Sequence, residues 1–89
     1  MTYFVYILLS KKDSRLYVGC THNPEQRLQE HNDGKVMATR NRRPLIMIYT
    51  QEVLDKTIAF NRERFLKSLW GSREKKKILK DYINRIGHI

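Results

Sequence analysis

The stretch YFVYILLSKKDSRLYVGC, residues 3–20, decides the fold because it holds two apolar runs separated by a short polar segment. Residues 3–9 are continuously aromatic or aliphatic, which is typical of a strand covered on both faces. Residues 10–15 are polar and predict a turn, and residues 16–20 form a second short strand. Two strands at this separation predict an antiparallel hairpin.

Capping residues predict three helices after the hairpin. The run at residues 45–50 predicts one more strand. Asn23 suits the cap of the first helix, Pro24 suits its first position, and Gly34 can end it in the left-handed conformation. Asp55 and Ser72 are expected to cap the two later helices. The result is a small sheet with helices on it, class α+β and order ββαβαα, with elements at residues 3–9, 16–20, 24–32, 45–50, 56–70 and 72–85.

Length and charge limit what the protein can be. Its 89 residues predict a single domain, residues 1–89, with one small core. It has 18 Lys and Arg against 9 Asp and Glu, a net charge of +9. Such an excess most often serves to bind a polyanion, above all nucleic acid. A generally basic surface and an anionic membrane are the alternatives.

The sequence also carries information about the compartment. Cys20 is the one cysteine, which excludes an intramolecular disulfide and a thiolate zinc site and fits a reducing environment. No apolar run is long enough to span a membrane. The first residues place their apolar stretch before their charges, the reverse of a signal peptide. We therefore expect a cytoplasmic protein with no membrane partner.

Glu63 is a charged residue at a position where the helix pattern predicts an apolar one. It follows Ala59 by four residues and precedes Leu66 by three, so it shares their apolar helix face. Burying a carboxylate is costly unless the group is paired or binds a metal. Glu63 is therefore either a metal ligand or part of an internal salt bridge, for example with Arg27 or Arg64.

Two further pairs of side chains carry groups that could take part in a reaction. Arg27 and His31 lie four residues apart on one helix face, where they can hold and protonate a phosphate, or else form a solvated surface. Tyr6 and Tyr17 share one face of the hairpin if Leu9 pairs with Leu16, as core residues or as partners for a water. A carboxylate, a cation and phenol or imidazole groups are together what phosphodiester hydrolysis needs.

These residues resemble the motifs of the GIY-YIG nuclease superfamily. Phe4-Val5-Tyr6 and Tyr17-Val18-Gly19, with ten residues between them, resemble its two tripeptides. The stretch from Arg27 to Asn32 resembles its Arg-x-x-x-His segment, and Ala59-x-x-x-Glu63 resembles its metal-ligand helix.

The resemblance covers about residues 3–80 and extends to Asn41-Arg42-Arg43-Pro44 and the Lys-rich tail, which are similar to small bacterial members. It implies a three-stranded antiparallel sheet flanked by helices. It also implies DNA cleavage with one Mg²⁺ or Mn²⁺, held by Glu63 and bound only weakly in the absence of substrate.

The resemblance further assigns expected roles to the remaining site residues. Arg27 would grip the scissile phosphate, and Tyr6 or Tyr17 would lie beside the attacking water. His31 would assist proton transfer or bind phosphate. Gly19 would keep the groove above the sheet open for a ligand.

Two clusters of basic residues are expected to contact DNA. If both flank the groove of Arg27 and Glu63, they form a phosphate track, although the run of lysines could instead be a solvated helix face. Phosphate contacts do not specify sequence, so selectivity would come from DNA shape, such as branches or nicks, or from a protein partner. The expected contacts are Lys35, Arg40, Arg42 and Arg43 in the loop, with Lys75 and Lys76 on the last helix.

Several positions leave alternatives open. Many catalytic members carry an Asn where this chain has residues 74–77, so a nucleic-acid-binding module without turnover is the alternative function. A basic accessory protein that docks on an acidic partner is a further one. Trp70 is expected in the core, with a base-stacking platform as the other interpretation. Cys20 is expected to be a small buried filler, and His22 and His88 to be solvated.

Overall fold

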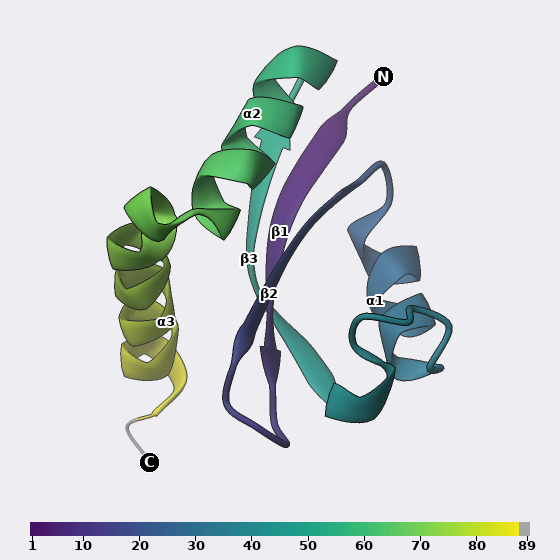
Figure 1. Cartoon of the computed structure of the whole chain (residues 1–89), viewed down its shortest axis with the longest axis vertical. Coiled ribbons are helices and arrows are strands. Elements are labelled where there is room, and N and C mark those ends of the chain that lie inside the picture. Colours follow the sequence, from purple (N-terminus) through teal and green to yellow (C-terminus); the bar gives the residue numbers. More distant parts are fainter. Residues whose placement is uncertain (88–89) are drawn as a thin grey trace.

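The computed structural model describes residues 1–87, so His88 lies outside the described residues. An α+β fold is observed, in the expected order of strands and helices (Figure 1). The elements are β1 (Tyr3–Ser10), β2 (Leu16–Thr21), α1 (Pro24–Asn32), the short helix η1 (Arg40–Arg42), β3 (Leu45–Val53), α2 (Lys56–Lys67), the short helix η2 (Leu69–Gly71) and α3 (Ser72–Ile86).

The sheet has three antiparallel strands in the order β2-β1-β3, with the apolar strand β1 in the centre. Leu9 pairs with Leu16, so the expected hairpin register is confirmed. β3 continues to Val53, beyond the expected end at residue 50, because it pairs along the whole length of β1. An irregularity in that pairing falls at Ile48, between the partners of Ile7 and Leu8.

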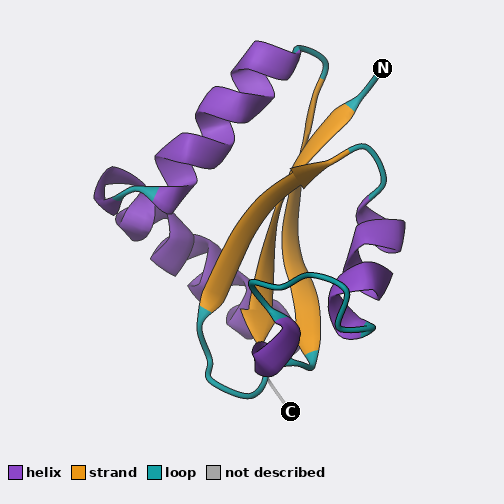
Figure 2. Cartoon of the chain, turned by 45° about the vertical axis from the view of Figure 1, so that its right-hand side comes forward, coloured by secondary structure: helices purple, strands orange, loops and turns teal. Residues whose placement is uncertain are grey.

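Helices cover both faces of the sheet (Figure 2). On one face Leu28 of α1 packs beside the cluster of Tyr6, Leu8 and Leu45. On the other face α2 and α3 pack over the larger cluster, where Leu66 has no exposed surface. This division follows from β1, whose alternate side chains enter opposite cores.

The caps of the first two helices are as expected, while the third differs. The side chain of Asn23 accepts a hydrogen bond from the Gln26 amide, and that of Asp55 accepts one from Ile58. Gly34 adopts a φ of +80°, the left-handed conformation expected of it. Ser72 is not a cap: it is the first residue of α3, and its hydroxyl donates to the carbonyl of Leu69.

The helix expected over residues 56–70 ends early. Ser68 is extended, and η2 follows as a separate turn. A Cβ at Gly71 would collide with the backbone of Phe65, so this sharp turn depends on glycine. The core position expected for Trp70 is therefore wrong, because its side chain is 85% exposed.

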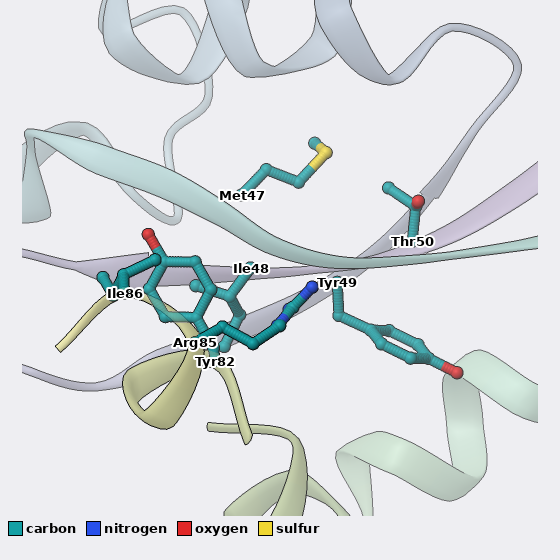
Figure 3. Close-up of a pocket in the computed structure, with 7 residues that line it drawn as sticks. All are labelled: Met47, Ile48, Tyr49, Thr50, Tyr82, Arg85 and Ile86. Atoms are coloured by element: carbon teal, nitrogen blue, oxygen red, sulfur yellow. The ribbon is translucent and has the colours of Figure 1, made fainter. Parts of the chain in front are cut away.

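A cavity of about 540 Å³ opens between β3 and the last turns of α3 (Figure 3). Tyr82 and Ile86 of α3 face Ile48 of β3 across it. None of the seven described residues that line it is a carboxylate, so it does not hold the predicted chemistry. Within residues 1–87, no helix has the length and apolarity that crossing a membrane requires.

Candidate active site

Tyr6 reaches the site by crossing the neighbouring strand. Tyr6 on β1 pairs with Gly19 on β2, and its ring lies over the glycine backbone. A Cβ at Gly19 would collide with the hydroxyl and ring of Tyr6. The expectation that Gly19 keeps space open for a ligand is therefore wrong, because the Tyr6 ring fills that space. Glycine is needed here so that a phenol can pass over the strand.

A buried chain of hydrogen bonds runs from Tyr6 into the basic loop. The Tyr6 hydroxyl is 2.9 Å from His31 Nε2, and His31 Nδ1 is 2.6 Å from Thr39 Oγ1. None of the three residues is more than 1% exposed. His31 therefore has no exposed surface through which it could contact a phosphate in this structure.

Burial determines which groups in this series of hydrogen bonds carry a proton. Burial, together with the positive charge of Arg27, lowers the pKa of His31 to about 4. The imidazole is therefore neutral near pH 7. Burial also raises the pKa of Tyr6 to about 12, although the nearby Arg27 guanidinium acts in the opposite direction. The Tyr6 hydroxyl thus keeps its proton in the resting protein.

Arg27 and Tyr17 complete the α1 side of the site. Arg27 is partly exposed and donates to Glu30 at 2.9 Å, an ion pair that a phosphate could replace. Tyr17 is half-buried, and its ring lies 5.1 Å from that of His31 and 6.4 Å from that of Tyr6, centroid to centroid. These two phenols and the imidazole form one packed aromatic group.

Glu63 lies on α2, which packs on the other face of the sheet. Its side chain on α2 is 17% exposed, and its carboxylate lies 2.8 Å from Lys67 Nζ. The salt bridge suggested with Arg27 or Arg64 is not observed; Lys67 is the partner. Burial is the main cause of the raised pKa of Cys20 and of Tyr6, and the negative charge of Glu63 adds to both shifts. The candidate residues thus come from helices on both faces of the sheet, and β2 is the strand at its edge.

A cleft of about 370 Å³ lies beside this edge, between the end of β2 and the start of α1. It extends from Cys20, which is partly buried as expected of a small filler, to Arg27 and Glu30. His22, at its rim, is exposed and bonds through Nδ1 to the carbonyl of Thr2. The cleft gives an anionic ligand access to Arg27.

The residues present fit a weakly held divalent cation. No group of three or more His, Cys, Asp or Glu side chains that could hold a metal exists within residues 1–87. Mg²⁺, however, is often bound by one or two carboxylates together with waters and substrate phosphates. Glu63 supplies one such carboxylate, and the Lys67 ammonium balances its charge in this structure.

The two basic clusters lie on opposite sides of the sheet. The loop of residues 33–44 joins α1 to β3, whereas Lys75 and Lys76 belong to α3 on the other face (Figures 1 and 2). The condition for a single phosphate track, that both clusters flank one groove, is therefore not met. Continuous phosphate contact with both would require the nucleic acid to pass around an edge of the sheet.

Within the loop, the basic residues differ in availability. Lys35 and Arg40 are exposed. Arg42 is half-buried and pairs with Asp13 at 2.9 Å, and Arg43 donates to the carbonyl of Arg40 at 2.8 Å. Arg42 and Arg43 therefore help to hold the loop in place, while Lys35 and Arg40 project into solvent.

Thr39 is the site residue that sequence reasoning missed. It lies in an irregular basic segment, where nothing in the local pattern marks a threonine as buried. Asn32, by contrast, ended the quoted Arg27 to Asn32 motif. Its side-chain amide donates to the Leu45 carbonyl at 2.9 Å and accepts from the Leu45 amide at 2.8 Å. Asn32 thereby closes the loop that carries Thr39.

Comparison with known proteins shows which family the chain is similar to. A family model described as the GIY-YIG catalytic domain matches residues 2–77. The chain is 41% identical over 78 residues to a UPF0213 protein of Natronomonas pharaonis, covering 86% of this chain and 88% of that protein. It is 35% identical over 80 residues to a UPF0213 protein of Staphylococcus haemolyticus, covering 89% and 95%.

A solved structure is similar as well. The solution NMR structure of a UPF0213 protein from Bacillus halodurans has a TM-score of 0.56 and 32% sequence identity, covering 90% of this chain and 84% of that one. The chain therefore belongs to the GIY-YIG family, whose catalytic domain is that of a nuclease acting on nucleic acid. Its relatives within that family are the small UPF0213 proteins, whose names state no reaction.

Proposed function

We propose that the protein is a metal-dependent DNA endonuclease with low intrinsic sequence specificity. The observation that carries the proposal is the 2.9 Å contact between the Tyr6 hydroxyl and Nε2 of buried His31, on the helix that also carries Arg27. Burial is the main cause of the raised pKa of Tyr6; the Arg27 charge acts against it and the Glu63 charge adds to it. A phosphate bound to Arg27 would thus lie beside a phenol, a neutral imidazole and a carboxylate suited to Mg²⁺ or Mn²⁺.

In this proposal Tyr6 receives the proton of the attacking water. A phenol with a pKa of about 12 is a poor base if its own proton has nowhere to go. Here that proton can pass to His31 Nε2 as the new one arrives. The water oxygen bonds to phosphorus, the bond to the leaving oxygen breaks, and that oxygen takes a proton from solvent. Tyr17 packs against His31 and helps to orient the water.

Substrate binding would itself prepare this transfer. The Arg27 charge contributes to the low pKa of His31. A phosphate on Arg27 would cancel that charge and raise the pKa of His31 toward its ordinary value. The imidazole would then become a better proton acceptor when DNA is present. A divalent cation on Glu63 would neutralise the charge that develops on the phosphate.

The finer assignments follow from this proposal. Lys35 and Arg40, both exposed, are proposed to contact the DNA backbone, with Arg42 and Arg43 placing the loop. Lys75 and Lys76 are proposed to contact nucleic acid on the α3 side. We further propose a single domain over residues 1–89, a cytoplasmic location and a role in DNA repair or recombination, with DNA shape or a protein partner supplying selectivity.

A binding module without turnover is the second candidate. It is favoured by the ion pair of Glu63 with Lys67, because the ammonium occupies the carboxylate that a metal would need. It is also favoured by Glu74, at the place where catalytic members often carry Asn, since Glu74 is engaged with Arg62.

The test compares cleavage of plasmid, flap and branched DNA in Mg²⁺ and Mn²⁺ by the wild type and by Glu63→Gln and Arg27→Ala. Each variant is expected to lose about 100-fold or more in rate. Glu52→Gln, which removes an exposed carboxylate on β3, is the matched control and should cleave normally. Equal cleavage by all the proteins would reject this site, and DNA binding without cleavage of any substrate would favour the second candidate.

A further inference from the structure

The turn between α2 and α3 exposes two large apolar side chains. Leu69 is 90% exposed and Trp70 is 85% exposed, where the chain leaves α2 in Figure 1. Phe65, one turn earlier, is 41% exposed. Adjacent exposed side chains of this size often mark a binding surface. Neither the core nor the site around Tyr6 uses them.

Cations border this aromatic surface. A groove of about 550 Å³ is lined by Phe65 and Trp70 together with Arg73 and Lys77 of α3. Two acids, Glu74 and Asp81, also line it. Glu74 is neutralised by Arg62 of α2, whose guanidinium lies 5.9 Å from the centre of the Phe65 ring.

The charges decide which partner this surface suits. α3 carries six Lys and Arg residues, Arg73, Lys75, Lys76, Lys77, Lys80 and Arg85, against Glu74 and Asp81. A second copy of the chain has the same net charge of +9 and would bring like charges together at this face. A strand of nucleic acid carries negative phosphates, which complement the cations of α3. It also carries bases, which stack on indole rings such as that of Trp70.

We propose that Trp70, Arg73 and Lys77 form a binding site for single-stranded nucleic acid. A base stacks on the Trp70 indole, and the flanking phosphates contact the guanidinium and the ammonium. Trp70 follows the C-terminal end of α2, the helix that carries Glu63. This inference rests on the proposed function. It narrows the substrate of that function to DNA that carries a single-stranded arm next to the cleaved duplex.

Trp70 is the one tryptophan in the chain, so its fluorescence reports this surface directly. The probe is oligothymidylate of about a dozen nucleotides, within the size that single-strand sites cover. The full chain is titrated in EDTA, which prevents any metal-dependent cleavage. We expect the oligonucleotide to quench Trp70 fluorescence, and an abasic strand of the same length and charge to leave it nearly unchanged.

Affinities are measured by anisotropy of a labelled oligonucleotide. Trp70→Ala should weaken binding about 5- to 150-fold, the value of one stacked base, while Trp70→Phe should retain most of the affinity. Leu69→Ala is the matched control, because it truncates an equally exposed neighbour that cannot stack; its affinity should stay within about twofold. Thermal unfolding should be unchanged in Trp70→Ala, since an exposed indole contributes little to folding.

Three outcomes would overturn the inference. The first is wild-type affinity in Trp70→Ala, and the second is equal quenching by the abasic strand. The third is a dimer seen in sedimentation that Trp70→Ala dissociates, which would make this face a self-association surface. The cleavage assay with Glu63→Gln separates the two proposals. Cleavage without stacking would reject only this inference, and stacking without cleavage would reject only the nuclease.

Discussion

At the scale of single residues, the burial of His31 is the feature with the clearest solution signature. The ring bonds to Tyr6 and Thr39 and has no exposed surface. Its neutral form is therefore favoured by the fold, whereas the unfolded chain binds a proton with the ordinary pKa of 6.5. Stability must consequently depend on pH between these two values.

We predict that stability falls as the pH is lowered from about 6.5 to about 4. In this window the unfolded state takes up a proton that folded His31, with a pKa of about 4, does not. The loss amounts to at most about 3 kcal/mol. Urea unfolding at a series of pH values measures it. His31→Gln should remove this part of the slope, and His22→Gln, at an exposed histidine, should retain it. An unchanged slope in His31→Gln would contradict the assignment.

A second prediction at the scale of single residues concerns Lys67. Its ammonium pairs with the Glu63 carboxylate that we propose as the metal ligand. A helical pair of this spacing is worth about 0.3–0.5 kcal/mol, so a metal that displaces Lys67 must overcome about that much. Lys67→Met should lower the Mn²⁺ concentration for half-maximal cleavage about twofold. Lys56→Met, at the other end of α2, should leave it unchanged, and a higher requirement in Lys67→Met would count against Glu63 as the ligand.

At the scale of elements, Arg62 links two helices and a strand. From α2 it donates to Gln51 of β3 at 2.8 Å and forms a two-contact ion pair with Glu74 of α3. This ion pair lowers the pKa of Glu74 and raises that of Arg62. The clamp positions α3, and therefore Lys77, relative to α2.

Glu74→Gln is expected to destabilise the fold by about 1 kcal/mol. The value lies below that of a buried charged hydrogen bond because the Glu74 side chain is 39% exposed. The contribution is present above the ordinary pKa of Glu and is lost as the pH falls and Glu74 protonates. Thermal unfolding measures the change. Asp81→Asn, an exposed acid on the same helix, should shift stability by less than about 0.5 kcal/mol. Equal effects would show that the clamp adds nothing.

At the scale of the whole molecule, the net charge of +9 is divided between the two sides of the sheet. The loop beside α1 presents Lys35 and Arg40, and α3 presents its cations on the other side. The two sides therefore suit two different parts of a nucleic acid. In the proposals above these are the duplex at the cleavage site and the single-stranded arm.

We predict that duplex binding weakens steeply with salt, because bound cations are released from the DNA. The plot of log affinity against log salt should lose about 0.9 of slope for each phosphate contact removed. Lys35→Ala with Arg40→Ala should thus flatten the slope for blunt duplex by about 1.8. Lys77→Ala should leave the salt dependence of duplex binding unchanged and make the salt dependence of oligothymidylate binding less steep. Identical changes in both slopes would mean that the two sides do not act separately.

Much of the fold could be predicted from the sequence because the relevant signals are local. Apolar runs, a polar turn and capping residues indicate the hairpin, the element order and the faces that Tyr6 and Tyr17 share. The two tripeptides that contain Tyr6 and Tyr17, together with the spacing of Arg27, His31 and Glu63, indicated the family and predicted the candidate site. These patterns depend on residues a few positions apart, where backbone geometry alone decides which side chains are neighbours.

Only the tertiary structure decided what those side chains contact. The Tyr6 ring fills the space above Gly19, Thr39 bonds to His31, and Trp70 lies in solvent. Each fact depends on how distant segments pack against one another, which periodicity does not contain. The sequence by itself therefore determined the order of the strands and long helices, the shared faces and, Thr39 apart, the chemical groups proposed for the site. Packing across the sheet decided which groups meet at the edge of β2, because contacts between distant segments depend on the whole fold.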